Sequence, residues 1–186
     1  AVGVDVQYNT RIESVKELQD KGYTSVILAI GASKPGTLKL EEGETVNAID
    51  FLTKFKETDG NFDAGKHVVV IGGGNTAMDA ARAAKMTKGV ETSSLVYRRT
   101  KRFMPADEEE LIMALEDGVE FKELLSPVKL VNGVLTCKVM KLGDYDASGR
   151  RGVVETDETR EVPADTVVVA VGEKVETEFY QAYGIH

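Results

Sequence analysis

The sequence predicts an α/β fold with three layers, in which helices cover a parallel sheet and an antiparallel β-meander follows. Segments 68–71 and 166–171 are β-branched or apolar throughout, which is typical of strands buried on both faces of a parallel sheet. Segment 76–84 combines helix-forming residues with a lack of glycine and proline. Segments 128–131 and 134–142 flank Asn-Gly, the strongest short signal for a β-hairpin.

The first 65 residues predict two strands and two helices. We expect strands at Gly3–Tyr8 and Ser25–Gly31, the second apolar and buried, and helices at Ile12–Lys21 and Val46–Lys56. The second helix places its apolar residues on one face, and Thr45 is positioned to cap it. Polar loops connect these elements.

The central stretch His67–Ala84 reads HVVVIGGGNTAMDAARAA and predicts a strand, a glycine turn and a helix. Its residues fit G-x-G-x-x-A with Gly72, Gly74 and Ala77 at the motif positions. In a Rossmann-like NAD(P)-binding unit the first glycine permits the turn, the second lets a pyrophosphate approach the backbone, and the small third residue packs the helix on the strand. The helix N-terminus then offers its N–H groups to phosphate. The alternative is a plain glycine turn in an α/β domain.

Two adjacent arginines follow the next predicted strand, Ser93–Tyr97, about 20 residues beyond the glycines. At this place an acidic residue binds the ribose of NAD, whereas arginine accommodates the 2′-phosphate of NADP. Arg98 and Arg99, with Lys101 and Arg102 beyond them, therefore favour NADPH over NADH and argue against FAD at this motif. The alternative is a solvated basic loop.

The rest of the chain predicts a helix, a third strand and the meander. Pro105 and Asp107 open a helix with an acidic first turn that ends at Gly118, and Val119–Phe121 follows as a strand. After the hairpin we expect two short strands, Val153–Glu155 and Glu161–Pro163.

The segment Thr166–Gly172 resembles Ser25–Gly31, because each runs from a hydroxyl residue through an aliphatic stretch to Ala, a β-branched residue and Gly. The two are either ordinary core strands or a pair of crossover strands that end where the backbone nears a cofactor. Their position outside the nucleotide unit favours the second interpretation.

Composition limits the partners and the chemistry. The net charge of −8 disfavours nucleic acid and anionic membrane as partners, and no apolar run reaches the roughly 20 residues of a membrane span. Cys137 is the single cysteine, so the chain forms no internal disulfide and holds no cysteine-ligated cluster of its own. The start shows no signal peptide, and we expect a cytoplasmic protein. No side chain suggests a catalytic nucleophile, an acid or base, or a metal ligand set.

The stretches VVVIGGGNTAMDAARAA and VYRRTKRFMPADEEELIMALEDGVEF resemble the NADPH-binding domain of the glutamate synthase small-subunit-like FAD/NADPH oxidoreductases. CKVMKLGDYDASGRRGVVETDETREV is similar to bacterial members described as selenate reductase subunits. The resemblance covers essentially the whole chain. It implies the tail of a first FAD-domain half at 1–35, a connecting loop and helix at 36–65, the NADPH-binding domain at 66–163, and a crossover to the second FAD-domain half at 164–186.

The resemblance also implies the cofactor-binding residues. The pyrophosphate would lie on the glycine turn and the start of the helix, the 2′-phosphate on the arginines, and the nicotinamide near the last glycine; the residues are Gly72, Gly73, Gly74, Asn75, Thr76 and Ala77, then Arg98 and Arg99, then Val171 and Gly172.

Three features of the family pattern are missing: a second upstream glycine motif, a Gly-Asp flavin motif after Gly172, and the N-terminal cysteine clusters. We therefore expect the middle of a longer reductase that binds NADPH, with FAD incomplete here and iron–sulfur clusters elsewhere. Its function would be to pass hydride from NADPH to FAD and electrons to an iron–sulfur domain or partner subunit. The alternatives are a non-catalytic Rossmann nucleotide-binding module and, disfavoured by the arginines, a methyltransferase.

Overall fold

The computed structural model describes residues 3–32, 34–145, 147, 149, 151–174 and 177–182. The chain divides into a smaller unit of residues 1–34 and 174–186 and a larger unit of residues 35–173. Each unit is described by itself. The predicted segments 1–35 and 164–186 include Ala1, Val2, Ser33 and residues 175–176 and 183–186, which lie outside the described residues.

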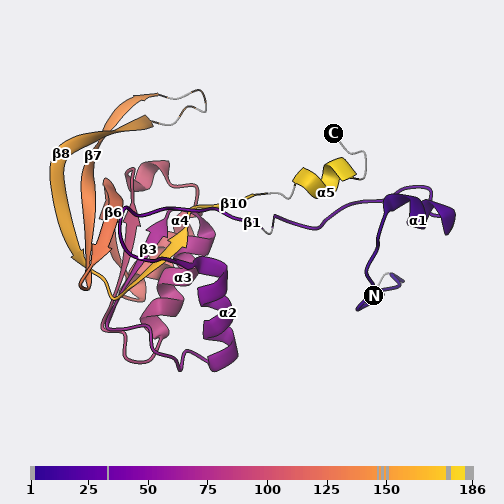
Figure 1. Ribbon diagram of the computed structural model, residues 1–186, viewed down its shortest axis with the longest axis horizontal. Helices are drawn as coiled ribbons and strands as arrows, with labels where there is room; N and C mark the ends of the chain where they lie inside the picture. The colour runs from indigo at the N-terminus through magenta and orange to yellow at the C-terminus, as the bar shows by residue number, and fades with distance from the viewer. Residues whose placement is uncertain are drawn as a thin grey trace. The chain divides into compact units, whose positions relative to one another are not determined.

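The larger unit contains a five-stranded sheet with the order β2-β9-β3-β4-β5 (Figure 1). Every neighbouring pair in this sheet is parallel. The strands are β2 (Val46–Asn47), β3 (His67–Gly72), β4 (Thr92–Tyr97), β5 (Glu120–Glu123) and β9 (Thr166–Ala170). Ile71 pairs with Val96 on one side of β3, and Gly72 pairs with Ala170 on the other. The carboxyl ends of the three central strands therefore meet at one edge.

Three helices cover one face of this sheet: α2 (Ala48–Thr58), α3 (Asn75–Met86) and α4 (Glu108–Glu116) (Figure 1). Alternate residues of β3 serve the two faces, because successive side chains of a strand point in opposite directions. Val68 and Val70 pack with the helices, whereas Val69 and Ile71 pack on the opposite side. This double burial explains why β3 is apolar throughout.

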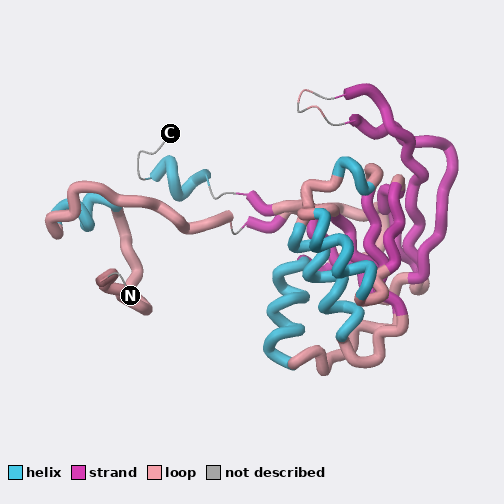
Figure 2. The backbone as a smooth tube through the Cα atoms, turned by 180° about the vertical axis from the view of Figure 1, so that it is seen from behind, coloured by secondary structure: helices cyan, strands magenta, loops and turns pink. Residues whose placement is uncertain are grey.

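The opposite face is covered by an antiparallel sheet with the order β6-β7-β8. Its strands are β6 (Leu125–Val131), β7 (Val134–Tyr145) and β8 (Arg151–Pro163). Leu125, Leu135, Cys137 and Val162 are buried between the two sheets. Figure 2 shows the resulting layers from behind, with helices, parallel sheet and antiparallel sheet in turn. The predicted three-layer fold is confirmed.

The hairpin turn lies where it was predicted. Asn132 and Gly133 both have positive φ, 50° and 77°, as a type I′ turn requires. The expectation of two short strands at 153–155 and 161–163 is wrong, because β8 is continuous. Register shifts between Lys138 and Met140 and between Leu142 and Tyr145 let the long ribbon stay paired while it bends. Most of β8 is exposed and polar, so it lacks the apolar alternation that would have revealed it.

The start of α2 also differs from the prediction. Val46 and Asn47 pair with Val168 and Val169 as β2, so the helix begins only at Ala48. Asn47, rather than Thr45, is the N-cap, and its Oδ1 accepts a hydrogen bond of 2.8 Å from the backbone N–H of Ile49.

In the smaller unit, α1 (Val15–Asp20) is capped by the Ser14 hydroxyl, which accepts from the N–H of Glu17 at 3.1 Å. The predicted strands Gly3–Tyr8 and Ser25–Gly31 are wrong: neither segment forms a strand, and Ile27 is 91% exposed. An apolar segment becomes a buried strand only beside partner strands, and none of the described strands pairs with either segment.

Two short strands, β1 (Lys34–Pro35) and β10 (Glu173–Lys174), pair with each other. Next to them, the N–H of Gly36 donates to the carbonyl of Gly172 at 2.7 Å. The segments that leave and re-enter the larger unit are thus joined by backbone hydrogen bonds. The remaining helix is α5 (Thr177–Ala182).

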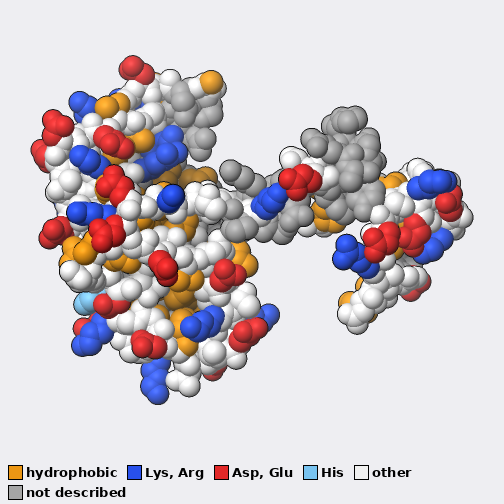
Figure 3. Space-filling model, in the orientation of Figure 1, with side chains coloured by type: hydrophobic (Ala, Val, Ile, Leu, Met, Phe, Trp, Pro, Cys, Tyr) orange, Lys and Arg blue, Asp and Glu red, His pale blue; other side chains and the backbone are white. Residues whose placement is uncertain are grey.

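Positive and negative side chains are interspersed over the visible face of the larger unit (Figure 3). Within the described part of the chain, no helix combines the length and the apolar character that a membrane span requires.

Candidate dinucleotide-binding site

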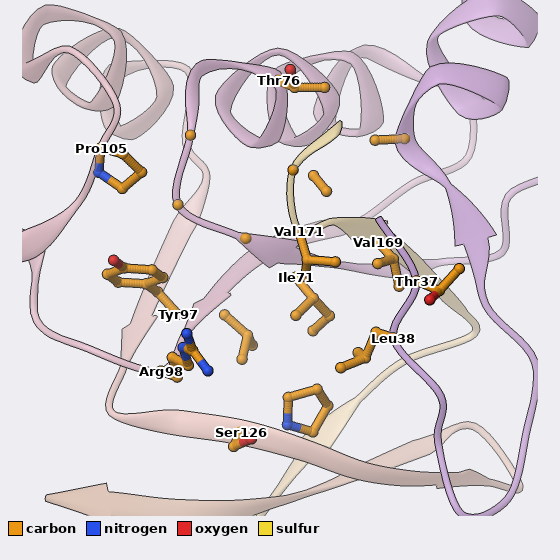
Figure 4. Close-up of a pocket in the computed structure, with 18 of the residues that line it drawn as sticks. Thr37, Leu38, Ile71, Thr76, Tyr97, Arg98, Pro105, Ser126, Val169 and Val171 are labelled. Atoms are coloured by element: carbon orange, nitrogen blue, oxygen red, sulfur yellow. The ribbon is translucent and has the colours of Figure 1, made fainter. Parts of the chain in front are cut away.

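A pocket of about 640 Å³ lies at the carboxyl ends of β3, β4 and β9. Its size falls in the range of small-molecule sites, and in open parallel sheets ligands bind at this edge. Figure 4 shows Tyr97 and Arg98 on one side of the pocket, Thr37 and Val169 on the other, Val171 between them, and Thr76 at the start of α3. All the predicted binding residues except Asn75 and Ala77 line this pocket.

The three glycines of the turn have different surroundings. A Cβ at Gly72 would lie 2.4 Å from the carbonyl oxygen of Ala170, and one at Gly73 would lie 2.4 Å from the ring of Tyr97. A Cβ at Gly74 would meet no atom within 4 Å. The fold itself therefore requires the first two glycines. Gly74 leaves open space in front of the helix, as the predicted approach of a pyrophosphate to the backbone demands.

The N-terminus of α3 provides the positive end of a helix dipole at the pocket. Gly74 is the N-cap, no side chain caps the helix, and its first turn holds no acidic residue. Thr76 lines the pocket. Ala77 is fully buried, and its Cβ would lie 3.0 Å from a Cβ at Gly72, so it packs the helix onto β3. The start of α3 can therefore bind an anion through its backbone.

Asn75 lies outside the pocket lining, and its amide is hydrogen-bonded to Asp107. Its Nδ2 donates to the Asp107 carboxylate at 2.9 Å, and its Oδ1 accepts from the backbone N–H of Asp107 at 3.0 Å. The structure therefore does not bring the Asn75 side chain together with the other predicted pyrophosphate residues.

The two arginines occupy different environments. Arg98 is exposed and lines the pocket. Arg99 is only 8% exposed, and its Nε donates a 2.8 Å hydrogen bond to the carbonyl of Arg151 in β8. Its own carbonyl accepts from the N–H of Leu124 at 3.2 Å. Sequence spacing treated the pair as equivalent, but the structure fixes Arg99 against the antiparallel sheet and leaves Arg98 at the pocket surface.

Val171 and Gly172 also line the pocket, just beyond β9. The neighbouring Gly36 is close-packed here: a Cβ on it would lie 2.5 Å from the carbonyl oxygen of Gly172. The two backbone segments can therefore approach closely only with glycine at this position.

The sequence analysis missed two walls of the pocket. One consists of Thr37 and Leu38, in a segment expected to be a polar loop; the segment instead bonds to β6, through Glu41 N–H to the carbonyl of Val128 at 2.8 Å. The other is the start of β6, Leu125–Pro127, which precedes the residues predicted as strand. Neither carries a short motif. The only sign of these two walls in the sequence was the apolar character of Leu38 and Leu125.

The pocket lining offers backbone, hydroxyl and guanidinium groups, and the described residues that form it include no His, Cys, Asp, Glu or Lys side chain. Burial raises the pKa of the Cys137 thiol to about 11, and this side chain lies between the sheets. Among the described residues, no group of three or more His, Cys, Asp or Glu side chains could hold a metal ion. The arrangement can bind a diphosphate on the glycine turn and a second anion at Arg98.

A family model described as pyridine nucleotide-disulphide oxidoreductase matches residues 1–186. The chain is 41% identical over 190 residues to the oxidoreductase YgfK of Escherichia coli, and the match covers 100% of this chain and 18% of that protein. It is 40% identical to the NADPH-Fe(3+) oxidoreductase subunit beta of Geobacter sulfurreducens, with 96% of this chain and 29% of that protein covered. It is 36% identical to the glutamate synthase [NADPH] small chain of Escherichia coli, with 92% and 41% covered.

Among solved structures, FprA of Mycobacterium tuberculosis superposes with a TM-score of 0.66 at 22% identity. The match covers 86% of this chain and 52% of that one, and it shows a shared fold. The chain thus spans less than half the length of these curated relatives. The resemblance to the glutamate synthase small-subunit-like oxidoreductases is confirmed, and the chain belongs to the pyridine nucleotide-disulphide oxidoreductase family.

Proposed function

We propose that this chain is the NADPH-binding part of a flavoprotein oxidoreductase. The whole protein would pass hydride from NADPH to FAD and electrons onward to an iron–sulfur domain or partner subunit. The observation that carries the proposal is the pocket itself, in which an open glycine turn at a helix N-terminus lies opposite the exposed Arg98. The chain's own residues bind and orient the dinucleotide, whereas the nicotinamide, when bound, supplies the redox chemistry.

The glycine turn supports diphosphate binding. The space beside Gly74 is open, and the uncapped first turn of α3 begins at the same residue. Backbone N–H groups with no side-chain acceptor are available to phosphate oxygens, and the helix dipole adds a favourable charge interaction. We assign the pyrophosphate to Gly72, Gly73, Gly74 and Thr76, and we assign a packing role to Ala77.

Arg98 supports NADPH rather than NADH. Arg98 is an exposed residue of the pocket directly after β4, the strand next to β3, where the adenosine ribose of a Rossmann-bound dinucleotide lies. The Geobacter sulfurreducens and glutamate synthase relatives carry NADPH in their names, which supports the same assignment. Because Arg99 is buried and bonded to Arg151, we assign to it the placement of its neighbour.

Val171 and Gly172 would then lie near the nicotinamide. Both residues line the same pocket as Arg98. The paired backbone at Gly36 and Gly172 is where the chain would cross to and from an FAD domain formed by segments outside 36–163.

The test is calorimetric titration of the purified chain with NADPH and with NADH. We expect wild type to bind NADPH more tightly. Arg98→Ala should weaken NADPH binding roughly 10- to 100-fold, because a charge-assisted hydrogen bond contributes about 1.5–3 kcal/mol, and should leave NADH binding nearly unchanged. Arg160→Ala is the matched control, since Arg160 is an exposed arginine of β8 outside the pocket lining and outside the basic segment.

Equal affinity of wild type for the two dinucleotides would contradict the 2′-phosphate assignment. The proposed reduction of FAD has to be tested in the full-length protein. If the full-length protein, carrying its FAD, binds NADPH but shows no bleaching of flavin absorbance, then the non-catalytic nucleotide-binding module is the correct description.

A further inference from the structure

We infer that Asn75 and Asp107 form a clasp that positions the basic segment 98–104 against the glycine turn, and that this clasp contributes to discrimination between NADPH and NADH. The discrimination rests on the function proposed above; the positioning does not. Asn75 is then a positioning residue that acts through the basic segment, rather than a direct ligand of the pyrophosphate.

The clasp uses both polar atoms of the Asn75 amide. Nδ2 donates to Oδ2 of Asp107 at 2.9 Å, and Oδ1 accepts from the N–H of Asp107 at 3.0 Å. A third bond runs beside it, from the N–H of Ala106 to the carbonyl of Gly73 at 3.0 Å. The successive residues Ala106 and Asp107 are therefore hydrogen-bonded to Gly73 of the glycine turn and to Asn75 at the start of α3, respectively.

The end of the basic segment is attached to the same turn through Tyr97. The Tyr97 ring lies under Gly73, where an added Cβ would approach it to 2.4 Å. Its hydroxyl donates to the carbonyl of Phe103 at 2.8 Å. The segment that carries Arg98, Lys101 and Arg102 is thus held at its start by β4, near its end by Tyr97 and just beyond its end by the clasp.

The chemistry of the clasp suits a site for two anions. Asp107 is the N-cap residue of α4, and the N-terminal end of that helix stabilises its charge. Asn75 holds this carboxylate without contributing a charge of its own. At the same time its side chain leaves the first backbone N–H groups of α3 unobstructed, because both amide atoms are directed to Asp107.

The size of each variant's effect on NADPH binding follows from the hydrogen bonds of the clasp that it removes. Asn75→Ala breaks both bonds, whereas Asp107→Ala breaks only the one to the carboxylate. Asp107→Asn keeps an oxygen that can accept from Asn75. The double variant Asn75→Ala/Asp107→Ala removes no hydrogen bond of the clasp beyond the two that Asn75→Ala removes. The effects of the two substitutions on NADPH binding should therefore not add.

The experiment compares these variants in the 186-residue chain by calorimetric titration with NADPH and NADH. We expect Asn75→Ala to weaken NADPH about 5- to 10-fold, the equivalent of one or two net hydrogen bonds, and to weaken NADH by about 2-fold or less. The double variant should match Asn75→Ala, Asp107→Ala should show a smaller loss, and Asp107→Asn should keep the wild-type ratio. Asp79→Asn, on the exposed side of α3, is the control.

Hydrogen exchange gives a readout that needs no dinucleotide. In Asn75→Ala the amides of residues 100–106 should exchange faster than in wild type, while those of β3 should be unchanged. If their exchange is unchanged, or if NADPH and NADH weaken equally in Asn75→Ala, the inference is overturned. If exchange quickens but wild type does not distinguish the dinucleotides, the proposed 2′-phosphate site fails and the positioning stands. If Asn75→Ala does not fold, the contrast between Asp107→Ala and Asp107→Asn decides in the same way.

Discussion

A methyl group added at Gly72 would lie 2.4 Å from the carbonyl oxygen of Ala170, whereas one added at Gly74 would meet no atom within 4 Å. The same chemical change therefore tests the fold at one position and the ligand site at the other. Gly74 has φ −98° and ψ 175°, an extended conformation that alanine adopts without strain.

We expect Gly74→Ala to change the free energy of unfolding by less than about 0.5 kcal/mol and to weaken NADPH binding at least roughly tenfold, because the methyl group occupies the space assigned to the pyrophosphate. Gly72→Ala should instead lower stability by about 1–3 kcal/mol, since β3 and β9 must separate to accept it. Urea denaturation and calorimetric titration measure the two effects. A Gly74→Ala variant that binds as wild type would place the pyrophosphate elsewhere.

The contrast between Arg98 and Arg99 shows what a residue-level pattern can predict. The spacing from the glycines predicted that both arginines lie near the glycine turn, and both line the pocket. It could not show that Arg99 is buried with its Nε bonded to Arg151, because that partner lies 52 residues away in β8. Asn75 differs from expectation for the same reason: its partner Asp107 belongs to another helix.

At the scale of elements, the backbone pairing of Gly36 with Gly172 positions a segment that lines the pocket. Gly36 donates to the Gly172 carbonyl at 2.7 Å, and a Cβ there would lie 2.5 Å from that oxygen. The pairing therefore depends on the absence of a side chain.

We expect Gly36→Ala to push the two segments apart and to weaken dinucleotide binding about 3- to 10-fold for NADPH and NADH alike, because Val171 and Gly172 shift while Arg98 does not. Fluorescence or calorimetric titration measures both affinities. Gly143→Ala is the control for adding a methyl group, since Gly143, like Gly36, has no positive φ, lies outside the pocket lining and would have its closest contact with the exposed side chain of Val154, at 3.1 Å. A selective loss of NADPH alone would contradict this account.

Elements buried by partners within the larger unit were predictable from the sequence. The apolar strand β3, the alanine-rich α3 and the Asn132–Gly133 turn each follow from local pattern, and the surroundings agree with it. The segment Ser25–Gly31 carries an equally apolar pattern but is exposed, because a strand needs neighbours that local sequence does not specify. The prediction of the long polar β8 failed for the opposite reason. Its pairing with β7 makes it a strand although its sequence lacks an apolar pattern.

At the scale of the whole molecule, Asp165 ties the end of the meander to the start of the central strand. Its Oδ2 accepts from the N–H groups of Lys66 and His67 at 2.8 and 2.9 Å, and its own N–H donates to the carbonyl of His67 at 2.7 Å. The hydrogen bonds from His67 and Lys66 lower the pKa of the Asp165 carboxyl below its ordinary value. This end of the sheet is opposite the pocket edge, so it contributes to stability without touching the site.

A carboxyl whose pKa is lower in the folded chain than in the unfolded chain stabilises the fold above the unfolded pKa and loses that contribution as pH falls through the folded pKa. Asp165 is exposed, and solvent screening reduces its effect to on the order of 1 kcal/mol. We therefore expect Asp165→Asn to lower the Tm by about 2–4 °C at pH 7. The difference from wild type should shrink as the pH falls below about 4.

Thermal denaturation followed by circular dichroism between pH 7 and pH 2.5 measures this effect, with Asp157→Asn on β8 as the matched control, because Asp157 is an exposed aspartate of the same unit. NADPH affinity at pH 7 should be unchanged in Asp165→Asn, since the hydrogen bonds that lose their charged acceptor lie at the far end of β3 from the glycine turn. A Tm difference that stays constant down to pH 2.5 would show that the loss comes from packing rather than from the charge of the carboxylate.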